Sequence, residues 1–538
     1  MEFDFIVIGA GSAGGQLVSE LTRDPARRVL LIEAGGSHKD LKVEMPAGWG
    51  ALGNDPKFSW CHWTEPEPMA HGRRVSIPRG KVLGGSSSIN GMIYIRGQRS
   101  DYDAWVQEGA SGWSWDELLP DFMATEHQLN LKNDAHGVGG SLTAASLATV
   151  HPVSRAMIEA AKSAGLSEVE DFNAGQAEGC GLYQVNVREG RRESIARRAI
   201  EPALKRKNLT LADHSLVEQI LFEGRRATGV RYRRRDGTVV DARASIEVIV
   251  CAGSLESPGI LMRSGIGPSD QLQALGIPVL HHLPGVGQNL QDHAVIPMAY
   301  RLRAGAPSLN ASLRGLGLVA SLLRYLLTRS GPMTTPPAEF GAYIRSSEGL
   351  PHTDVQVFGL PVTGDIEAAL KGGRQTTESK PGLTLAPYQV RPWSRGQIAL
   401  KDADPRSLPR VQVNYLTDER DQLVSLRAVR WLREMASQPS LRDLIEHETE
   451  PGAQRTSDAD LMEWIGRVVT TGHHPVGTCR MGQANDPRSV VDPQLRVIGL
   501  EGLRVADASV MPALISGNTN ATSVVIGHRA ARLVTSAD

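Results

Sequence analysis

Three glycines near the start of the chain, Gly9, Gly11 and Gly14, have the spacing of a nucleotide-binding turn, and an acidic residue, Glu33, follows them. Glycines at these positions allow a tight turn and a close backbone approach to a pyrophosphate, whose charge is stabilised by the N-terminus of the next helix. A carboxylate after the second strand can accept ribose hydroxyl protons and repels the 2′-phosphate of NADP. The spacing predicts a dinucleotide site. It fits NAD and FAD equally, and a purely structural glycine turn has the same pattern.

Two adjacent histidines near the C-terminus, His473 and His474, are candidates for acid–base chemistry. A neutral imidazole accepts a proton near pH 7, which suits it to remove a hydroxyl proton. Paired histidines also suggest a metal site, but neighbouring residues on a strand point to opposite faces and no third ligand is close in the sequence. We therefore predict a base in this pair and no metal.

The segments around these residues predict an α/β fold. Residues 5–8 read as an apolar strand, residues 14–22 as a helix and residues 29–33 as a second strand, which makes half of a Rossmann-like unit. A final helix is expected over residues 519–531. Further strands, several of them separated by turn residues, are expected at 209–212, 220–224, 228–232, 246–252 and 503–507.

The motifs divide the chain into two predicted domains. Residues 1–150, 191–299 and 461–538 are expected to form a discontinuous, Rossmann-like nucleotide-binding domain. Residues 151–190 and 300–460 carry none of these motifs, and we assign them to a substrate domain with a β-sheet flanked by helices.

The charge balance excludes some partners. The 538 residues contain 58 Lys and Arg against 59 Asp and Glu, which argues against nucleic acid and against a polybasic membrane anchor. Four cysteines without CxxC spacing indicate reduced thiols, and we expect a cytoplasmic protein. The N-terminal residues read as a buried strand rather than a signal peptide.

No membrane span is expected, because no apolar run reaches the roughly 18 residues that a spanning helix needs. Residues 311–327 come nearest, but they contain Arg314 and Arg324 and place their leucines at helical spacing. We expect an amphipathic helix packed on its own domain, with peripheral membrane contact as the alternative.

Two longer blocks carry a family resemblance. GKVLGGSSSIN at residues 80–90 and HHPVGTCRMG at residues 473–482, together with the glycine turn, resemble the glucose-methanol-choline (GMC) family of flavin oxidoreductases. Blocks at residues 253–267 and 285–293 resemble it as well. The resemblance implies FAD rather than NAD as cofactor. It also implies oxidation of an alcohol to an aldehyde by hydride transfer to flavin N5.

The resemblance and the glycine turn together assign FAD contacts to residues from several parts of the chain. In members that attach the flavin covalently, a histidine precedes the asparagine that Asn90 matches, whereas this chain has Ile89. We therefore predict non-covalent FAD. The expected contacts are Gly9, Gly11, Ser12, Ala13, Gly14, Glu33, Ala34, Lys81, Gly84, Gly85, Ser86, Asn90, Gly91, Val217, Asp507, Asn518 and Thr519.

The resemblance also assigns the catalytic roles. His474 matches the histidine that faces the flavin and is expected to be the base, with His473 as the rival base or a substrate contact. Asn518 matches its partner, and its amide can donate to the substrate oxygen. His293, at the end of the block at residues 285–293, is expected to be a structural hydrogen-bonding residue.

The substrate is less well defined by the sequence. Glu339 matches a glutamate near the substrate cation in choline-using relatives, but Pro336, Pro337 and Ala338 replace its aromatic and polar neighbours. We therefore expect a primary alcohol, aromatic alcohols included, with oxygen or a quinone as electron acceptor. A choline-type dehydrogenase, a hydroxynitrile lyase on the same fold and a non-catalytic flavin sensor are the alternatives.

Overall fold

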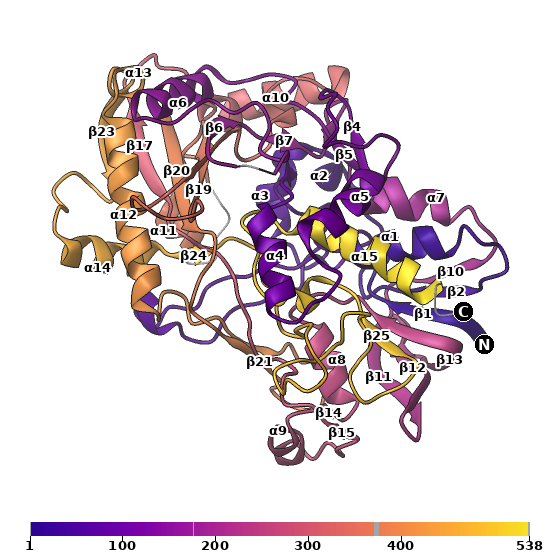
Figure 1. Cartoon of the computed structure of the whole chain (residues 1–538). Helices are drawn as coiled ribbons and strands as arrows, with labels where there is room; N and C mark the ends of the chain where they lie inside the picture. The colour runs from indigo at the N-terminus through magenta and orange to yellow at the C-terminus, as the bar shows by residue number, and fades with distance from the viewer. Residues whose placement is uncertain (1, 176, 371–375, 536–538) are drawn as a thin grey trace.

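Two large β-sheets organise the part of the chain that the computed structural model describes, residues 2–175, 177–370 and 376–535 (Figure 1). One sheet lies beside both chain termini, and the other lies on the opposite side of the molecule under α12 (Glu419–Ala436). This arrangement confirms the predicted α/β fold with a second, helix-flanked sheet.

The first sheet is built around the predicted Rossmann-like unit. Its central strands pair in parallel, and each expected strand is present. Hairpins extend the sheet on one side, as the turn residues predicted. In order across the sheet the strands are β10 (Leu209–Ala212), β2 (Val29–Ile32), β1 (Glu2–Ile8), β13 (Val239–Val250), β12 (Arg226–Arg233) and β11 (Leu216–Glu223), with β25 (Leu503–Val505) beside β13.

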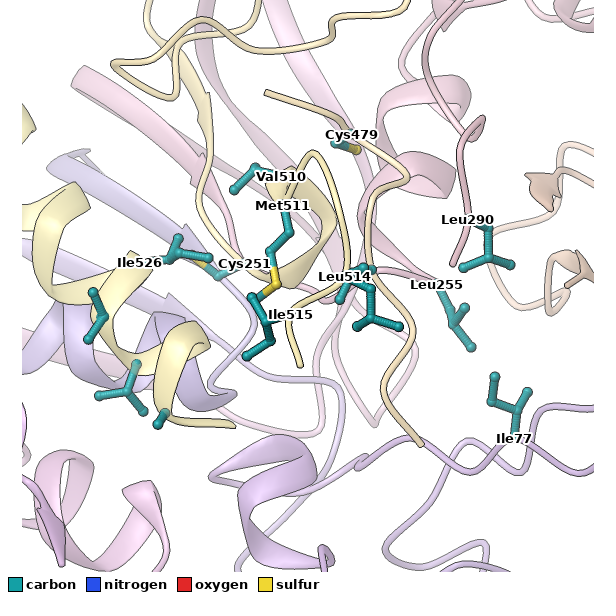
Figure 2. Close-up of a cluster of buried hydrophobic side chains, with 14 of the residues drawn as sticks. Ile77, Cys251, Leu255, Leu290, Cys479, Val510, Met511, Leu514, Ile515 and Ile526 are labelled. Carbon is teal, nitrogen blue, oxygen red and sulfur yellow. The ribbon is translucent and has the colours of Figure 1, made fainter. Parts of the chain in front are cut away.

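Helix α1 (Ser12–Leu21) packs against the C-terminal helix α15 (Asn520–Thr535) next to this sheet. The two helices approach closely because α15 has a glycine at the crossing: a Cβ on Gly527 would lie 2.1 Å from the carbonyl oxygen of Ala13. Figure 2 shows the neighbouring apolar core, in which Met511 and Ile515 lie near Cys251 at the end of β13. The C-terminal segment is therefore fixed against the nucleotide-binding unit.

The second sheet is mostly antiparallel, with α6 (Pro152–Ser163) and α12 packed against it. Helix α14 (Asp458–Val468) follows its edge strand in the chain and packs on α12. In order its strands are β23 (Ile445–Glu450), β17 (Met298–Leu302), β20 (Gly382–Gln389), β19 (Val355–Leu360), β18 (Phe340–Ile344) and β6 (Gly179–Leu182).

Some strands of the second sheet come from segments predicted for the nucleotide-binding domain. β16 (Ala294–Val295) and β24 (Thr470–Thr471) pair with each other, β16 also pairs with β20, and β17 begins at Met298. The chain therefore enters the second sheet before residue 299 and leaves it after residue 461. These crossings carry the segments around His293 and His474 to the junction of the two sheets.

Residues 311–327 form a helix, as expected, but they pack only partly as expected. Helix α10 (Gly315–Thr328) buries only Ser321 and Tyr325 and turns most of its leucines to solvent. The expected packing on its own domain is met only in part: Leu318 and Leu322 line the cavity described below, but the larger part of the apolar face points to solvent. No described helix is both long and apolar enough to cross a bilayer.

Candidate active site

A cavity of about 870 Å³ lies between the two sheets and brings most of the predicted site residues together. Gly14, Lys81, Gly84 and Glu339 are the predicted residues outside its lining. Those that line it are Gly9, Gly11, Ser12, Ala13, Glu33, Ala34, Gly85, Ser86, Asn90, Gly91, Val217, His473, His474, Asp507, Asn518 and Thr519.

Each of the three glycines of the turn is favoured at its position by a different structural feature. Gly9 has a φ of +100°, and a Cβ there would lie 2.4 Å from the carbonyl oxygen of Cys251. A Cβ on Gly14 would lie 2.0 Å from the carbonyl oxygen of Gly9, so this glycine permits the contact between turn and helix. A Cβ on Gly11 meets no protein atom within 4 Å and would project into open space. Gly11 caps α1 without a side-chain hydrogen bond, which leaves a cradle suited to a phosphate.

Glu33 is buried at the end of β2 with both carboxylate oxygens hydrogen-bonded to backbone amides. Oε2 accepts from the amide of Ala10 at 2.9 Å and Oε1 from that of Gly35 at 2.8 Å. Burial raises the pKa of Glu33 to about 7, although these bonds oppose the shift. A carboxylate has about four acceptor positions. Glu33 can therefore shape the glycine turn and still accept hydrogen bonds from a ribose.

The glycine–serine block packs directly on the glycine turn. A Cβ on Gly85 would lie 2.7 Å from Cα of Gly11, and the amide of Gly84 donates to the carbonyl oxygen of Ala10 at 2.8 Å. Gly84 lies just behind the lining and adopts a φ of +88°. The ammonium group of Lys81 lies 4.5 Å from the ring centre of Trp60, which itself lines the cavity.

Arg192 supports this block, and sequence reasoning missed it. Its Nη1 donates to Oδ1 of Asn90 at 2.7 Å and to the carbonyl oxygen of Asn90 at 2.6 Å, while Nε donates to Val43 O at 2.9 Å. Burial lowers the pKa of Arg192 to about 9. No signature block contains this residue, so no sequence signal pointed to it.

Asp507 lines the cavity and also closes a turn. Oδ2 accepts from the amide of Gly253 at 2.8 Å and from the hydroxyl of Ser257 at 2.6 Å, and Oδ1 accepts from the amide of Ser509 at 2.8 Å. The carboxylate thus joins the block at residues 253–267 to the C-terminal segment. The predicted flavin contact and the alternative of a capping residue are compatible at this position.

His474 and Asn518, 44 residues apart in the sequence, meet at the junction of the sheets. Nε2 of His474 lies 3.0 Å from Nδ2 of Asn518, and both residues line the cavity. Oδ1 of Asn518 has no hydrogen-bond partner among the described residues. On its other side, Nδ1 of His474 lies 2.9 Å from Nδ1 of His293.

His293 fixes the tautomer of His474. The carbonyl oxygen of Val390 can only accept, so Nε2 of His293, 3.0 Å away, carries a hydrogen. Burial lowers the pKa of His293 to about 3, so the ring is neutral and its Nδ1 is an acceptor. His474 must then donate through Nδ1, which leaves the lone pair on Nε2. His293 was expected to be structural, and this contact gives it a more specific position beside the base.

Burial lowers the pKa of His474 well below its ordinary value, and His293, His473 and Arg79 lower it further. The ring is therefore neutral at neutral pH, with a lone pair facing the cavity. Asp292 holds the backbone of His474: its Oδ1 accepts from the amide of His474 at 2.7 Å. The same carboxylate accepts from the hydroxyl of Tyr415 at 2.6 Å.

The two adjacent histidines do not lie on a strand, contrary to our expectation. β24 ends at Thr471, and His473 has a φ of +65°, which turns the chain so that both His473 and His474 line the cavity. The argument that their side chains face opposite ways is therefore wrong. Among the described residues, no three His, Cys, Asp or Glu side chains are grouped to hold a metal ion.

Glu339 is not brought into the cavity. It lies just before β18, is 1% exposed, and accepts hydrogen bonds from the amide of His151 at 2.8 Å and the hydroxyl of Ser154 at 2.7 Å. Both bonds end on Oε2, which joins the start of α6 to the second sheet. The expectation that Glu339 contacts substrate is not met by this position.

The cavity wall contributed by the second sheet and its neighbours is mainly apolar. Phe358 and His474 both pack near Tyr388, with ring centres 5.1 and 6.2 Å from it. The apolar residues of this wall include Val295, Pro297, Leu309, Leu313, Leu318, Leu322, Met333, Phe358, Leu360, Val362 and Ala386. Next to the lone pair of His474, the site therefore offers room for an apolar group.

Comparison with known proteins gives a consistent result. Residues 3–295 and residues 392–527 each match a GMC oxidoreductase family. The chain is 40% identical to mitochondrial choline dehydrogenase of Homo sapiens, over 99% of this chain and 90% of that protein. It is 39% identical to oxygen-dependent choline dehydrogenase of Escherichia coli strain K12, over 99% and 96%. It superimposes on pyridoxine 4-oxidase from Mesorbium loti with a TM-score of 0.88 and 34% identity, over 98% of each chain.

Proposed function

Because the chain belongs to the GMC oxidoreductase family, as its sequence blocks predicted, we propose that it oxidises a primary alcohol to an aldehyde with non-covalently bound FAD. The observation that carries the proposal is the contact between Nδ1 of His293 and Nδ1 of His474, which turns Nε2 of His474 toward the same cavity as the glycine cradle. An alcohol hydroxyl needs a base of this kind while hydride leaves its carbon.

The residues of the cavity fit FAD. Gly11 leaves open space beside the first turn of α1 for the pyrophosphate, and Glu33 keeps acceptor positions for the ribose. Ile89 lines the cavity where a histidine would offer an attachment atom, which supports non-covalent binding. When bound, the flavin supplies the hydride acceptor.

His474 takes the hydroxyl proton on Nε2, which the Nδ1–H bond to His293 keeps unprotonated. The amide of Asn518, 3.0 Å from the same nitrogen, holds the substrate oxygen beside it. A hydrogen bond to an oxygen that is losing its proton strengthens as negative charge develops. Burial lowers the pKa of His474 and so keeps the ring neutral.

The apolar wall around Phe358 favours an alcohol with an apolar or aromatic body. Choline is the second candidate, and the near 40% identity to choline dehydrogenases over the whole chain favours it. Against choline, Glu339 lies outside the cavity, so this carboxylate cannot contact the substrate cation. All four cysteines are free thiols, which fits the cytoplasmic location that we propose.

Anaerobic stopped-flow reduction tests the proposal. Benzyl alcohol, a linear primary alcohol and choline are each mixed with the yellow protein, and bleaching of the flavin is followed. We expect the first two to reduce it faster than choline, and acid precipitation to release intact FAD into the supernatant. Bleaching by choline alone would transfer the assignment to the second candidate, and bleaching by none of them would contradict alcohol oxidation. Reoxidation by oxygen is then compared with reoxidation by a quinone.

A further inference from the structure

Helix α10 carries an apolar face that no described part of the chain covers. Leu316 is 89% exposed and Leu327 82%, and three more of its large apolar side chains are more than half exposed: Val319, Leu323 and Leu326. At about 100° per residue, these five side chains fall within about 100° of arc on one side of the helix. The other large exposed apolar residues are scattered singly over other elements, as is usual for a folded protein.

The charge around this face has one sign. Residues 302–338 contain four arginines and no aspartate or glutamate. Arg314 precedes the helix and Arg324 flanks the apolar arc, and both are exposed. In the described part of the chain neither forms an ion pair with a carboxylate. An apolar helix face flanked by arginines is typical of helices that lie in the headgroup region of a bilayer.

The same helix forms part of the cavity wall. Leu318 and Leu322 line the cavity, and so do Leu309, Leu313 and Met333 next to the helix. Viewed along the helix axis, Leu322 lies about 40° from Leu326. The exposed arc and the cavity wall are therefore adjacent. Figure 1 places α10 at the periphery of the molecule, where a flat surface can reach it.

We propose that α10 docks the protein onto an anionic lipid bilayer, with the five exposed side chains inserted among the lipids and the arginines at the phosphates. A bilayer fits this face better than a protein partner does. The exposed arc has no aromatic anchor and no side chain that forms directional hydrogen bonds, whereas protein interfaces are enriched in both. Lipid chains need neither.

Vesicle flotation tests the assignment with the full-length, FAD-loaded protein. Vesicles of phosphatidylcholine with about a third phosphatidylglycerol provide the anionic surface. We expect the protein to float with them, and binding to weaken in phosphatidylcholine alone and in high salt, since salt screens the arginine–phosphate attraction. The double variant Leu323→Ser, Leu327→Ser should lower the vesicle partition coefficient at least about tenfold. Both side chains face outward, so flavin content should not change.

A matched control removes apolar side chains that are exposed elsewhere. Val138 is 79% exposed and Leu423 46%, and the variant Val138→Ser, Leu423→Ser should float like the wild-type protein. Failure of the wild-type protein to float, or equal flotation of the α10 variant, would overturn the proposal. Light scattering without lipid tests whether a second copy of the chain covers this face instead. If the wild-type protein were a dimer that did not float, and the α10 variant were a monomer, the face would be assigned to a second copy.

Discussion

The two ends of the cavity are built in different ways. At the nucleotide end, most contacts are made by backbone: Gly9, Gly11 and Gly85 bring main-chain atoms together, and Glu33 bonds to two amides. At the other end, side chains from distant segments form a chain of contacts through His293, His474 and Asn518. The first end depends on local spacing and the second on how the sheets meet. Substitutions should therefore separate cofactor binding from proton transfer.

The largest expected effect is at His474. His474→Ala removes the proton acceptor, and flavin reduction by alcohol should slow by about 10² to 10⁴ while FAD stays bound. The measurement is the anaerobic reduction rate at matched flavin content. His473→Ala is the control, because its ring lines the cavity without contacting Asn518 or His293. If His473→Ala gave the larger loss, the roles of the two histidines would be exchanged.

At the opposite end, Glu33→Ala should weaken FAD binding and leave the chemistry of the remaining holoenzyme unchanged. Loss of two charge-assisted hydrogen bonds, each worth about 1.5 to 3 kcal/mol, predicts at least about a hundredfold rise in the dissociation constant. Fluorescence of released FAD on dilution measures it. Glu33→Gln keeps the shape of the side chain, but its one oxygen can satisfy only one of the two amides. Its dissociation constant for FAD should therefore lie between those of the wild-type protein and Glu33→Ala. Unchanged affinity in Glu33→Ala would place the ribose elsewhere.

This difference also explains what the sequence could predict. The glycine turn, the strands of the first sheet and the glycine–serine block lie at short, regular spacing, and the structure has them where they were expected. His474 and Asn518 came from resemblance, and the structure does place them in contact. Glu339 lies outside the cavity lining, and matching neighbours in a sequence cannot show that His151 and Ser154 hold its Oε2 there. The outward leucines of α10 have the same periodicity as inward ones, so spacing alone could not orient the helix.

Substitution of His293 should slow flavin reduction less than substitution of His474 does. The loss should still exceed that expected from packing alone. His293→Leu removes the acceptor for Nδ1–H of His474, so the proton can move to Nε2 and block the base. Loss of such a supporting contact commonly costs about ten- to a hundredfold. His293→Gln should restore part of the rate, because its side-chain oxygen can accept the same hydrogen bond. Equal rates in the two variants at equal flavin content would show a packing role only.

Asn518→Ala removes one hydrogen bond near the base rather than the proton acceptor. One such bond to a group that gains charge predicts about a tenfold slower reduction. Binding of FAD should change little, because Asn518 is one of many lining residues. The comparison is with His474→Ala under the same conditions. A loss larger than that of His474→Ala would indicate that Asn518 has the leading role at this end.

The smallest effect concerns pH, and it tests whether His474 is the buried base. The base works unprotonated, and burial together with His293, His473 and Arg79 puts the pKa of His474 well below its ordinary value of 6.5. Protonation therefore removes activity only in acid, and the flavin reduction rate should stay flat from pH 6.5 upward, with its fall confined to lower pH. Stopped-flow reduction across this range provides the measurement. A rate that rises through pH 7 to 8 would mean that the base titrates in an open, solvated site, and it would contradict the assignment of the buried His474 as that base.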